Sequence, residues 1–440
     1  MSIYGAMFSG ISSLNANSQA MGVISDNISN LNTIGYKNTE ARFSTLVTGT
    51  GSSTNRYSPG GLTASSFQAA DRQGLLQAST SATDIAISGQ GFFVVNTDQV
   101  SSNGSFLFTR AGQFSVNANG ALVNAGGYFL QGWPTLADGS FDVDQNGIAD
   151  PTIPDPTSLA NLQSVDVTTL SGTATATSNV TLAANLPATA LVGDTNTATV
   201  QVFDALGVGH NIALQWDKTV AVPATWDLSV TGMTRTDNGA ASVSGATLAS
   251  FPLTIDTVVF NGDGTPASFT PTALAIPAGD WTTAAAASSI SFNLGSANQA
   301  DGVTQFASNY SVISIEQDGV TFGRFESISI GEDGQVNALF DNGIERAIFR
   351  LPVATFANSS ALDSRSGNAW AATTSAGSFF LNPAGTGASG TVSPASLETS
   401  TVDLGAEFTN MIITQRAYSA SSRIITTADQ MLEELVRIKR

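Results

Sequence analysis

Oxygen-bearing side chains that could bind a metal ion gather in one short stretch of the sequence. Asp142, Asp144, Asn146 and Asp150 follow the pattern Asp-x-Asp-x-Asn-Gly-x-x-Asp, which resembles the front half of a calcium loop. The twelfth position is Ile153 rather than the bidentate glutamate of such loops. Asp, Asn and Gly are also ordinary turn residues, so the sequence favours a solvated turn and keeps a calcium site as the alternative. It indicates no other cofactor.

The sequence offers no credible catalytic set. A Ser-His-Asp arrangement would have to use His210, the single histidine, and a lone histidine before a strand is usually a surface residue. Gly89 and Gly91 resemble part of a phosphate loop, but residues 92–95 continue as a strand, so the helix N-terminus of such a site is missing. Cysteine is absent, which excludes disulfides and thiolate chemistry. We therefore expect a protein that is not an enzyme.

The amino-acid composition limits the classes of binding partner that we expect. Only 11% of the 440 residues are charged, well below the quarter that is usual, and the net charge is −18. No basic patch is present, so we expect neither nucleic acid nor an anionic membrane surface as a partner. No apolar run approaches the roughly 20 residues that span a bilayer, so we expect no membrane insertion. No Lys or Arg precedes Lys37, so a cleaved secretory signal is not expected either.

Each end of the chain carries an apolar stripe with alternating spacings of three and four, which predicts two amphipathic helices packed along these stripes. The stripes bury too little apolar surface to order both ends within one chain. We therefore expect the ends to order when neighbouring copies cover them, with a stable intramolecular helical hairpin as the alternative. The apolar members are Tyr4, Met7, Ile11, Leu14, Met21 and Ile28 in the first stripe, and Leu404, Phe408, Met411, Tyr418, Ile425, Leu432 and Val436 in the second.

The sequence between the two terminal helices predicts short strands separated by Gly, Asn and Pro. The expected fold class is α+β and mainly β, with the two terminal helices forming a coiled-coil-like domain and nested β domains inserted between them. The expected parts are a helical polymerisation domain (1–32 with 402–440), an extended connector (33–75 with 360–401), a β domain (76–150 with 305–359) and an outer inserted β domain (151–304).

Two groups of residues near the ends form recognisable motifs. They are Asn27, Asn30, Asn32, Thr33, Gly35 and Tyr36 at one end, and Gln415, Arg416, Ala417 and Tyr418 at the other. These motifs resemble the axial proteins of the bacterial flagellum, the family of rod, hook and filament-junction proteins. Within that family, Gly89-Gln-Gly91-Phe92-Phe93 and Phe108-Thr109-Arg110 in the body are similar to hook proteins.

The resemblance implies a role. Hook subunits leave the cell unfolded through the flagellar type III export apparatus and form a homopolymer, a curved tube that works as a universal joint between motor and filament. It implies an extracellular place in the hook and basal body, with distal-rod, hook-cap and hook–filament junction proteins as partners. A distal-rod protein is the alternative within the family, although the large inserted β region argues against it. A secreted β-rich adhesin would explain the body but not the paired ends.

Overall fold

The computed structural model describes residues 3–47, 59–142, 144, 146, 148–150, 154–167 and 172–438. The chain divides into two compact units. The first unit comprises Met1–Thr169, Ile328–Ala338 and Arg346–Arg440, and the second comprises Leu170–Ser327 and Leu339–Glu345.

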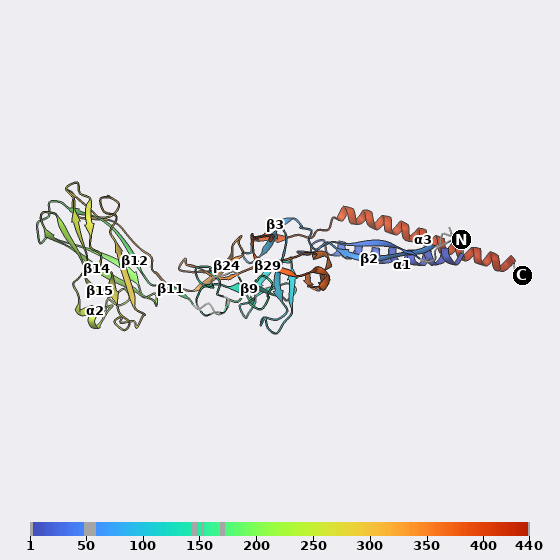
Figure 1. Ribbon diagram of the computed structural model, residues 1–440, viewed down its shortest axis with the longest axis horizontal. Helices are drawn as coiled ribbons and strands as arrows, with labels where there is room; N and C mark the ends of the chain where they lie inside the picture. The colour runs from blue at the N-terminus through green and yellow to red at the C-terminus, as the bar shows by residue number, and fades with distance from the viewer. Residues whose placement is uncertain are drawn as a thin grey trace. The chain divides into compact units, whose positions relative to one another are not determined.

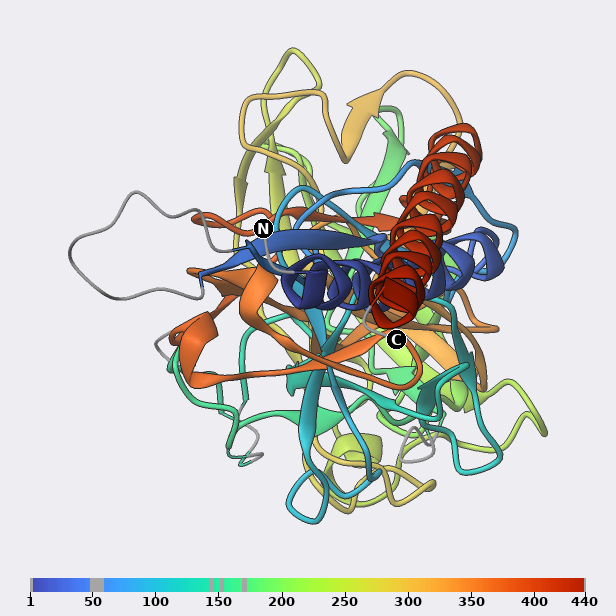
Figure 2. The same ribbon diagram turned by 90° about the vertical axis from the view of Figure 1, so that its right-hand side faces the viewer.

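Two long helices and a β-hairpin form one part of the first unit. Helix α1 spans Ile3–Ser29, helix α3 spans Leu404–Ile438, and the hairpin consists of β1 (Thr39–Val47) and β2 (Pro59–Gln68). Figure 1 shows α1, α3 and the hairpin alongside one another, and Figure 2 shows the two helices side by side. We call α1, α3, β1 and β2 together the helical end.

The two helices are antiparallel. Ser13 Oγ lies 2.7 Å from Ser421 Oγ, and Asn27 Nδ2 donates to Glu407 Oε1 at 3.2 Å. Both pairs fit the same alignment of the two helices, which places the start of α1 level with Met431. The turns of α3 that follow Met431 extend beyond the start of α1 (Figure 1). Asp403 starts α3 as an N-cap, because its Oδ1 accepts hydrogen bonds from the N–H groups of the first turn at 2.8 and 3.1 Å.

The rest of the first unit is a β domain. Its main sheet runs in the order β25-β9-β5-β6-β28-β27, and β26 pairs with β5 and β29. Trp133, Phe92 and Phe108 fill its core. The strands are β3 (Leu76–Ala78), β4 (Ile85–Ser88), β5 (Phe92–Asn96), β6 (Phe106–Thr109), β7 (Phe114–Val116), β8 (Leu122–Asn124), β9 (Phe129–Pro134), β10 (Gln163–Ser164), β26 (Pro352–Phe356), β27 (Asp363–Arg365), β28 (Ala369–Ala371), β29 (Phe379–Pro383), β30 (Thr391–Pro394) and β31 (Ser396–Glu398), with 3-10 turns η1 (Ser359–Ala361) and η2 (Thr374–Ala376). Strands β23 (Phe325–Ile330), β24 (Gln335–Phe340) and β25 (Glu345–Arg350) have residues in both units.

The second unit contains two sheets around one apolar core. The first sheet is antiparallel in the order β13-β14-β15-β16-β17, and the second runs β18-β19-β12-β20 with β21 also on β12. Trp216, Trp226 and Leu182 are fully buried in the shared core. The elements are β11 (Thr173–Thr175), β12 (Asn179–Pro187), β13 (Thr195–Phe203), β14 (Gly209–Val220), β15 (Thr225–Arg235), α2 (Gly245–Ala249), β16 (Leu253–Phe260), β17 (Pro266–Phe269), β18 (Leu274–Ile276), β19 (Ser288–Asn293), β20 (Thr304–Phe306), β21 (Ser311–Gln317) and β22 (Val320–Gly323).

The predicted fold class is confirmed: the chain is mainly β, with a helix at each end and β structure between them. The expected limits of the outer domain, 151–304, differ from those of the second unit. Strand β10 at 163–164 pairs with β9 of the first unit, whereas β20 and β21, at 304–317, pair with β12 of the second. The expected connector, 33–75 with 360–401, forms no unit of its own and belongs to the first unit. Among the described residues, no helix has the length and hydropathy that crossing a bilayer requires.

Candidate functional site

Small and polar side chains make the contact between α1 and α3. On α1, the buried residues that recur at helical spacing include Gly10, Asn17, Ala20, Ile24 and Asn27. A Cβ on Gly10 would lie 3.0 Å from Ile425 Cγ1, so the absence of a side chain there lets the helices approach closely. Among the α3 residues whose side chains the structure describes, the buried ones repeat every seven positions and are Glu407, Thr414, Ser421 and Ala428.

Most residues of the predicted apolar stripes lie beside this contact, although Ile425 faces Gly10 across it. On α1, stripe residues directly follow residues of the buried face in the sequence: Ile11 follows Gly10, and Met21 follows Ala20. The most deeply buried described residues of both helices therefore lie outside the predicted stripes. The exposed members are Tyr4, Ile11, Leu404, Phe408, Tyr418 and Val436, and the half-buried ones are Met7, Leu14, Met21, Ile28, Met411, Ile425 and Leu432.

Large apolar side chains thus cover the outside of the helical end. Tyr4 is 71% exposed and Ile413 is 60% exposed. Further exposed apolar residues of the same helices and hairpin are Phe8, Phe43, Leu46, Ile412, Ile424 and Met431. Large apolar side chains that gather on the exposed surface of a few elements are typical of a protein–protein interface.

Asn27 connects the end of α1 to both neighbouring elements. Its Nδ2 donates to the backbone O of Thr39 at 2.8 Å and to Glu407 Oε1 at 3.2 Å. Its Oδ1 accepts from the backbone N of Thr39 at 3.0 Å and from the Tyr36 hydroxyl at 3.2 Å. Burial raises the pKa of both Tyr36 and Glu407. This motif residue therefore fixes the turn after α1, the hairpin and the start of α3 to one another.

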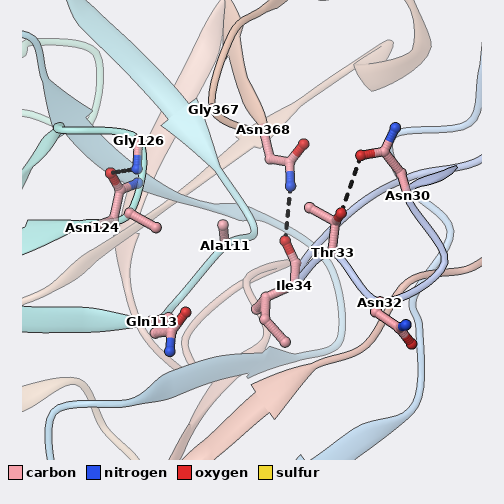
Figure 3. A pocket seen from close by; sticks show the side chains of 11 residues that line it. Asn30, Asn32, Thr33, Ile34, Ala111, Gln113, Asn124, Gly126, Gly367 and Asn368 are labelled. Carbon is pink, nitrogen blue, oxygen red and sulfur yellow. Dashed lines mark hydrogen bonds between the residues drawn. The ribbon is translucent and has the colours of Figure 1, made fainter. Parts of the chain in front are cut away.

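The turn that follows α1 lines a pocket with a volume of about 450 Å³ against the β domain (Figure 3). Thr33 Oγ1 donates to Asn30 Oδ1 at 3.0 Å, and Asn368 Nδ2 donates to the backbone O of Ile34 at 2.9 Å. Asn32 is exposed on the same wall. Gly35 has φ +68°, and a Cβ on it would lie 2.7 Å from the backbone N of Ala111, so only glycine fits there.

A buried ion cluster lies behind this turn. Lys37 Nζ and Arg110 Nη1 both donate to the carboxylate of Glu398, at 2.5 and 3.3 Å, and all three side chains are fully buried. Burial lowers the pKa of Lys37 and of Arg110, and the Glu398 carboxylate opposes that effect in both. The cluster joins residues 361 positions apart and so ties both ends of the chain to the β domain. In the sequence Arg110 stands in the Phe108-Thr109-Arg110 motif, and nothing there predicts that it meets Lys37 and Glu398.

The motif residues of α3 lie mostly on the outside. Gln415, Arg416 and Tyr418 are exposed, and Ala417 is half-buried. They lie further along α3 than Glu407, the residue that binds Asn27.

The suspected calcium loop is held by its own hydrogen bonds. The backbone N of Asn146 donates to Asp142 Oδ1 at 3.0 Å and to Asp144 Oδ1 at 3.3 Å, and the Asn146 side chain donates to Asp144 Oδ2 at 2.7 Å. These are the bonds of an Asx turn. The described residues include no group of three or more acidic or histidine side chains that could hold a metal ion, Asp150 included, and Ile153 lies outside them.

His210 is buried in strand β14, so the prediction of a surface histidine is wrong. Its Nε2 donates to Asp204 Oδ2 at 3.1 Å, its Nδ1 accepts from Ser242 Oγ at 2.8 Å, and Trp281 covers the ring at 4.5 Å between centroids. Thr283 Oγ1 also donates to Asp204, at 2.6 Å. Asp204, His210 and Ser242 are fully buried, so the three residues hold strands together and have no access to a substrate.

Comparisons with known proteins cover the whole chain. It is 33% identical to the flagellar hook protein FlgE of Caulobacter vibrioides and 32% identical to that of Rhizobium meliloti, over all of this chain and of each relative. It is 31% identical to the FlgE of Escherichia coli over 98% of both chains. The chain belongs to the flagellar hook protein family.

Four family models, each of which matches one segment of the chain, agree with that assignment. Residues 7–37 match the flagella basal body rod protein model and 393–438 the flagellar basal body rod FlgEFG protein C-terminal model. Residues 86–174 match the flagellar hook protein FlgE/F/G D1 domain, and 170–320 the flagellar basal body protein FlaE D2 domain. The structure is also similar to the crystal structure of Helicobacter pylori flagellar hook protein FlgE2, with a TM-score of 0.48 and 12% identity over 73% of this chain and all of that chain.

Proposed function

We propose that this hook-family chain polymerises through residues 1–32 and 402–440, which include both helices of the helical end, into the curved tube of the flagellar hook. The tube acts as a universal joint that transmits torque from motor to filament. Its subunits pass through the type III export apparatus to the outside of the cell and meet distal-rod, hook-cap and hook–filament junction proteins at the ends of the tube.

This proposal rests on which side chains the helical end buries and which it exposes. Small residues such as Gly10 and Ala428 occupy the contact between the helices, while Tyr4, Phe408 and Ile413 face solvent. Full burial of such a large apolar side chain stabilises a structure by about 1.5–3 kcal/mol. Neighbouring copies that cover these side chains supply that free energy, so we expect the ends to order on assembly.

Torque transmission needs a rigid connection between the helical end and the β domain. The Lys37–Glu398–Arg110 cluster supplies that connection, because it joins the segment that follows α1 to two segments of the β domain. The Asn27 bonds fix α1 to the start of α3 within the helical end. We also propose that the chain has no catalytic role, since the Ser242–His210–Asp204 arrangement is fully buried.

Electron microscopy of the concentrated full-length protein tests the proposal. We expect negative-stain images to contain curved tubes. The double variant F408S/I413S should lose them, because two exposed apolar side chains of the helical end are removed without touching the core of the single chain. V100S is the matched control, since Val100 is an exposed apolar residue of the β domain.

Straight rods would instead favour a distal-rod protein. Polymer that forms equally well with F408S/I413S would contradict assembly through the helical end.

A further inference from the structure

A groove on the helical end lies between α1, the hairpin and the start of α3. Its volume is about 320 Å³, the size of a site for a few side chains rather than for a whole helix. Val23, Phe43 and Ile413 give it apolar walls. Glu40 and Glu407 give it an acidic side.

The acidic side of this groove has no cation among the described residues. Glu407 interacts unfavourably with Glu40 and with Asp403, and burial raises its pKa further. None of these three carboxylates forms an ion pair within the described chain. The nearby cations are engaged elsewhere: Lys37 binds Glu398, and Arg42 stacks on Phe67 at 3.2 Å from the ring centroid.

The end of α3 has the complementary chemistry. Val436 is 65% exposed, and the Arg437 side chain is 74% exposed with only a long contact to Glu434. Lys439 and Arg440 follow in the sequence, so three of the chain's 16 basic residues fall in its last four positions.

A chain cannot place this tail in its own groove. Helix α3 is continuous from Leu404 to Ile438, so Glu407 and Arg437 are separated by 30 residues of helix, or about 45 Å. The last turns of α3 also project beyond the start of α1 (Figure 1). The tail is therefore available only to a second copy.

We propose that the groove between α1, β1 and the start of α3 receives the C-terminal turn of α3 from a second copy of this chain, with Val436 against the apolar walls and Arg437 beside Glu40 and Glu407. The contact is head-to-tail, and a head-to-tail contact that does not close into a ring builds an open helical filament. This inference rests on the proposed polymerisation and identifies one of the contacts that produce it.

Cross-linking in the polymer tests the contact directly. The chain has no cysteine, so the double variant E40C/R437C carries thiols at these two positions alone. A short bis-maleimide added to polymer should then give a ladder of covalent dimers, trimers and longer chains, because each copy has one groove and one tail. The controls are each single variant and E345C/R437C, in which an exposed glutamate of the second unit replaces Glu40.

Charge exchange gives a second readout. E40K and R437E should each raise the critical concentration for polymerisation about tenfold, because each places like charges together. The double variant E40K/R437E should return it close to the original value, whereas the control E345K/R437E should not.

Tubes of E40C/R437C that give no more ladder than E345C/R437C, or a double variant E40K/R437E no better than R437E, would overturn the inference and leave the proposed function standing. Failure of the unmodified chain to polymerise would instead overturn the proposed function, and this contact with it.

Discussion

The second unit and the helical end place their large side chains in opposite ways. In the second unit, Trp216 and Trp226 are fully buried between two sheets. In the helical end, Gly10 and Ala428 are buried while Phe408 and Ile413 face solvent. The second unit completes its core within one chain, whereas we propose that the helical end completes its packing only against neighbouring copies. On this proposal, the subunit combines a finished domain with a part that gains its stability from its neighbours.

The largest expected effect tests this contrast with one truncation in each region. Trp226→Ala should lower the free energy of unfolding of the second unit by about 4 kcal/mol, because it leaves a cavity in a closed core. Phe408→Ala should change the melting of the dilute chain by less than about 1 kcal/mol, yet weaken polymerisation. Thermal melting and sedimentation of both variants make the measurement. Equal destabilisation of the dilute chain by both would remove the contrast.

The second prediction concerns the ion cluster that joins the helical end to the β domain. Glu398→Gln should destabilise the first unit by about 3 kcal/mol, because Lys37 and Arg110 would stay buried without an anion. Urea unfolding followed by the tryptophans of the β domain measures it. Asp363→Asn is a control, since its partner Arg365 is exposed and such pairs contribute little. A loss as small as that of the control would exclude a structural role for the cluster.

The third prediction concerns the response of the second unit to acid. Burial lowers the pKa of His210 below 6.5, against the effect of Asp204, while the Arg235 and Asp237 charges oppose each other. The unfolded chain therefore binds the proton more tightly, so stability is complete above pH 6.5 and falls as the pH drops below it, by up to about 1.4 kcal/mol per pH unit. Melting against pH should show this slope in the parent chain and a reduced slope in His210→Gln. An unchanged slope would contradict the assignment.

The helical end should respond to acid in the opposite direction, with the smallest of these effects. Burial raises the pKa of Glu407 above 4.5, and the facing groups Asp26, Tyr36, Glu40 and Asp403 include no cation. The folded state then binds the proton more tightly, so this contribution is present at low pH and is lost as the pH rises above 4.5.

Glu407→Gln keeps an oxygen for Asn27 and should stabilise the docking of α3 at pH 7 by about 1 kcal/mol or less. Hydrogen exchange of 404–414 in the dilute chain between pH 5 and 7, compared with the parent chain at the same pH, measures this small difference in protection. A weaker docking in Glu407→Gln would show that the charge itself is needed.

The sequence predicted the fold class because hydrophobic periodicity is a local signal. Spacings of three and four marked both helices, and short alternating runs marked the β body. It could not predict which helix face packs inside the chain. The apolar stripe residues Ile11 and Met21 are exposed and half-buried, respectively, in the single chain. The buried positions beside them are Gly10 and Ala20, which carry only a weak hydrophobic signal.

The sequence indicated the residues of the candidate site as motifs, but it could not predict which residues they contact. Asn27 and Gly35 stood in a recognised motif, yet their roles depend on Glu407 and Ala111, which only the folded chain brings near. The clustering of Lys37, Arg110 and Glu398 likewise depends on contacts between distant segments. His210 was misjudged because its burial comes from Trp281 and Ser242 on other parts of the second unit. The Asx bonds of the calcium-like stretch are local, so the sequence could indicate them without knowledge of the fold.

Hydrogen exchange of the full-length chain, recorded on the dilute monomer and on the polymer, tests the central claim most directly. Residues 5–28 and 405–436 should exchange quickly in the monomer and become strongly protected in the polymer, while Trp216 and Trp226 in the second unit should lie in segments protected in both. Strong protection of 5–28 and 405–436 in the dilute monomer would mean that the helical end is already complete within one chain, and would contradict the account.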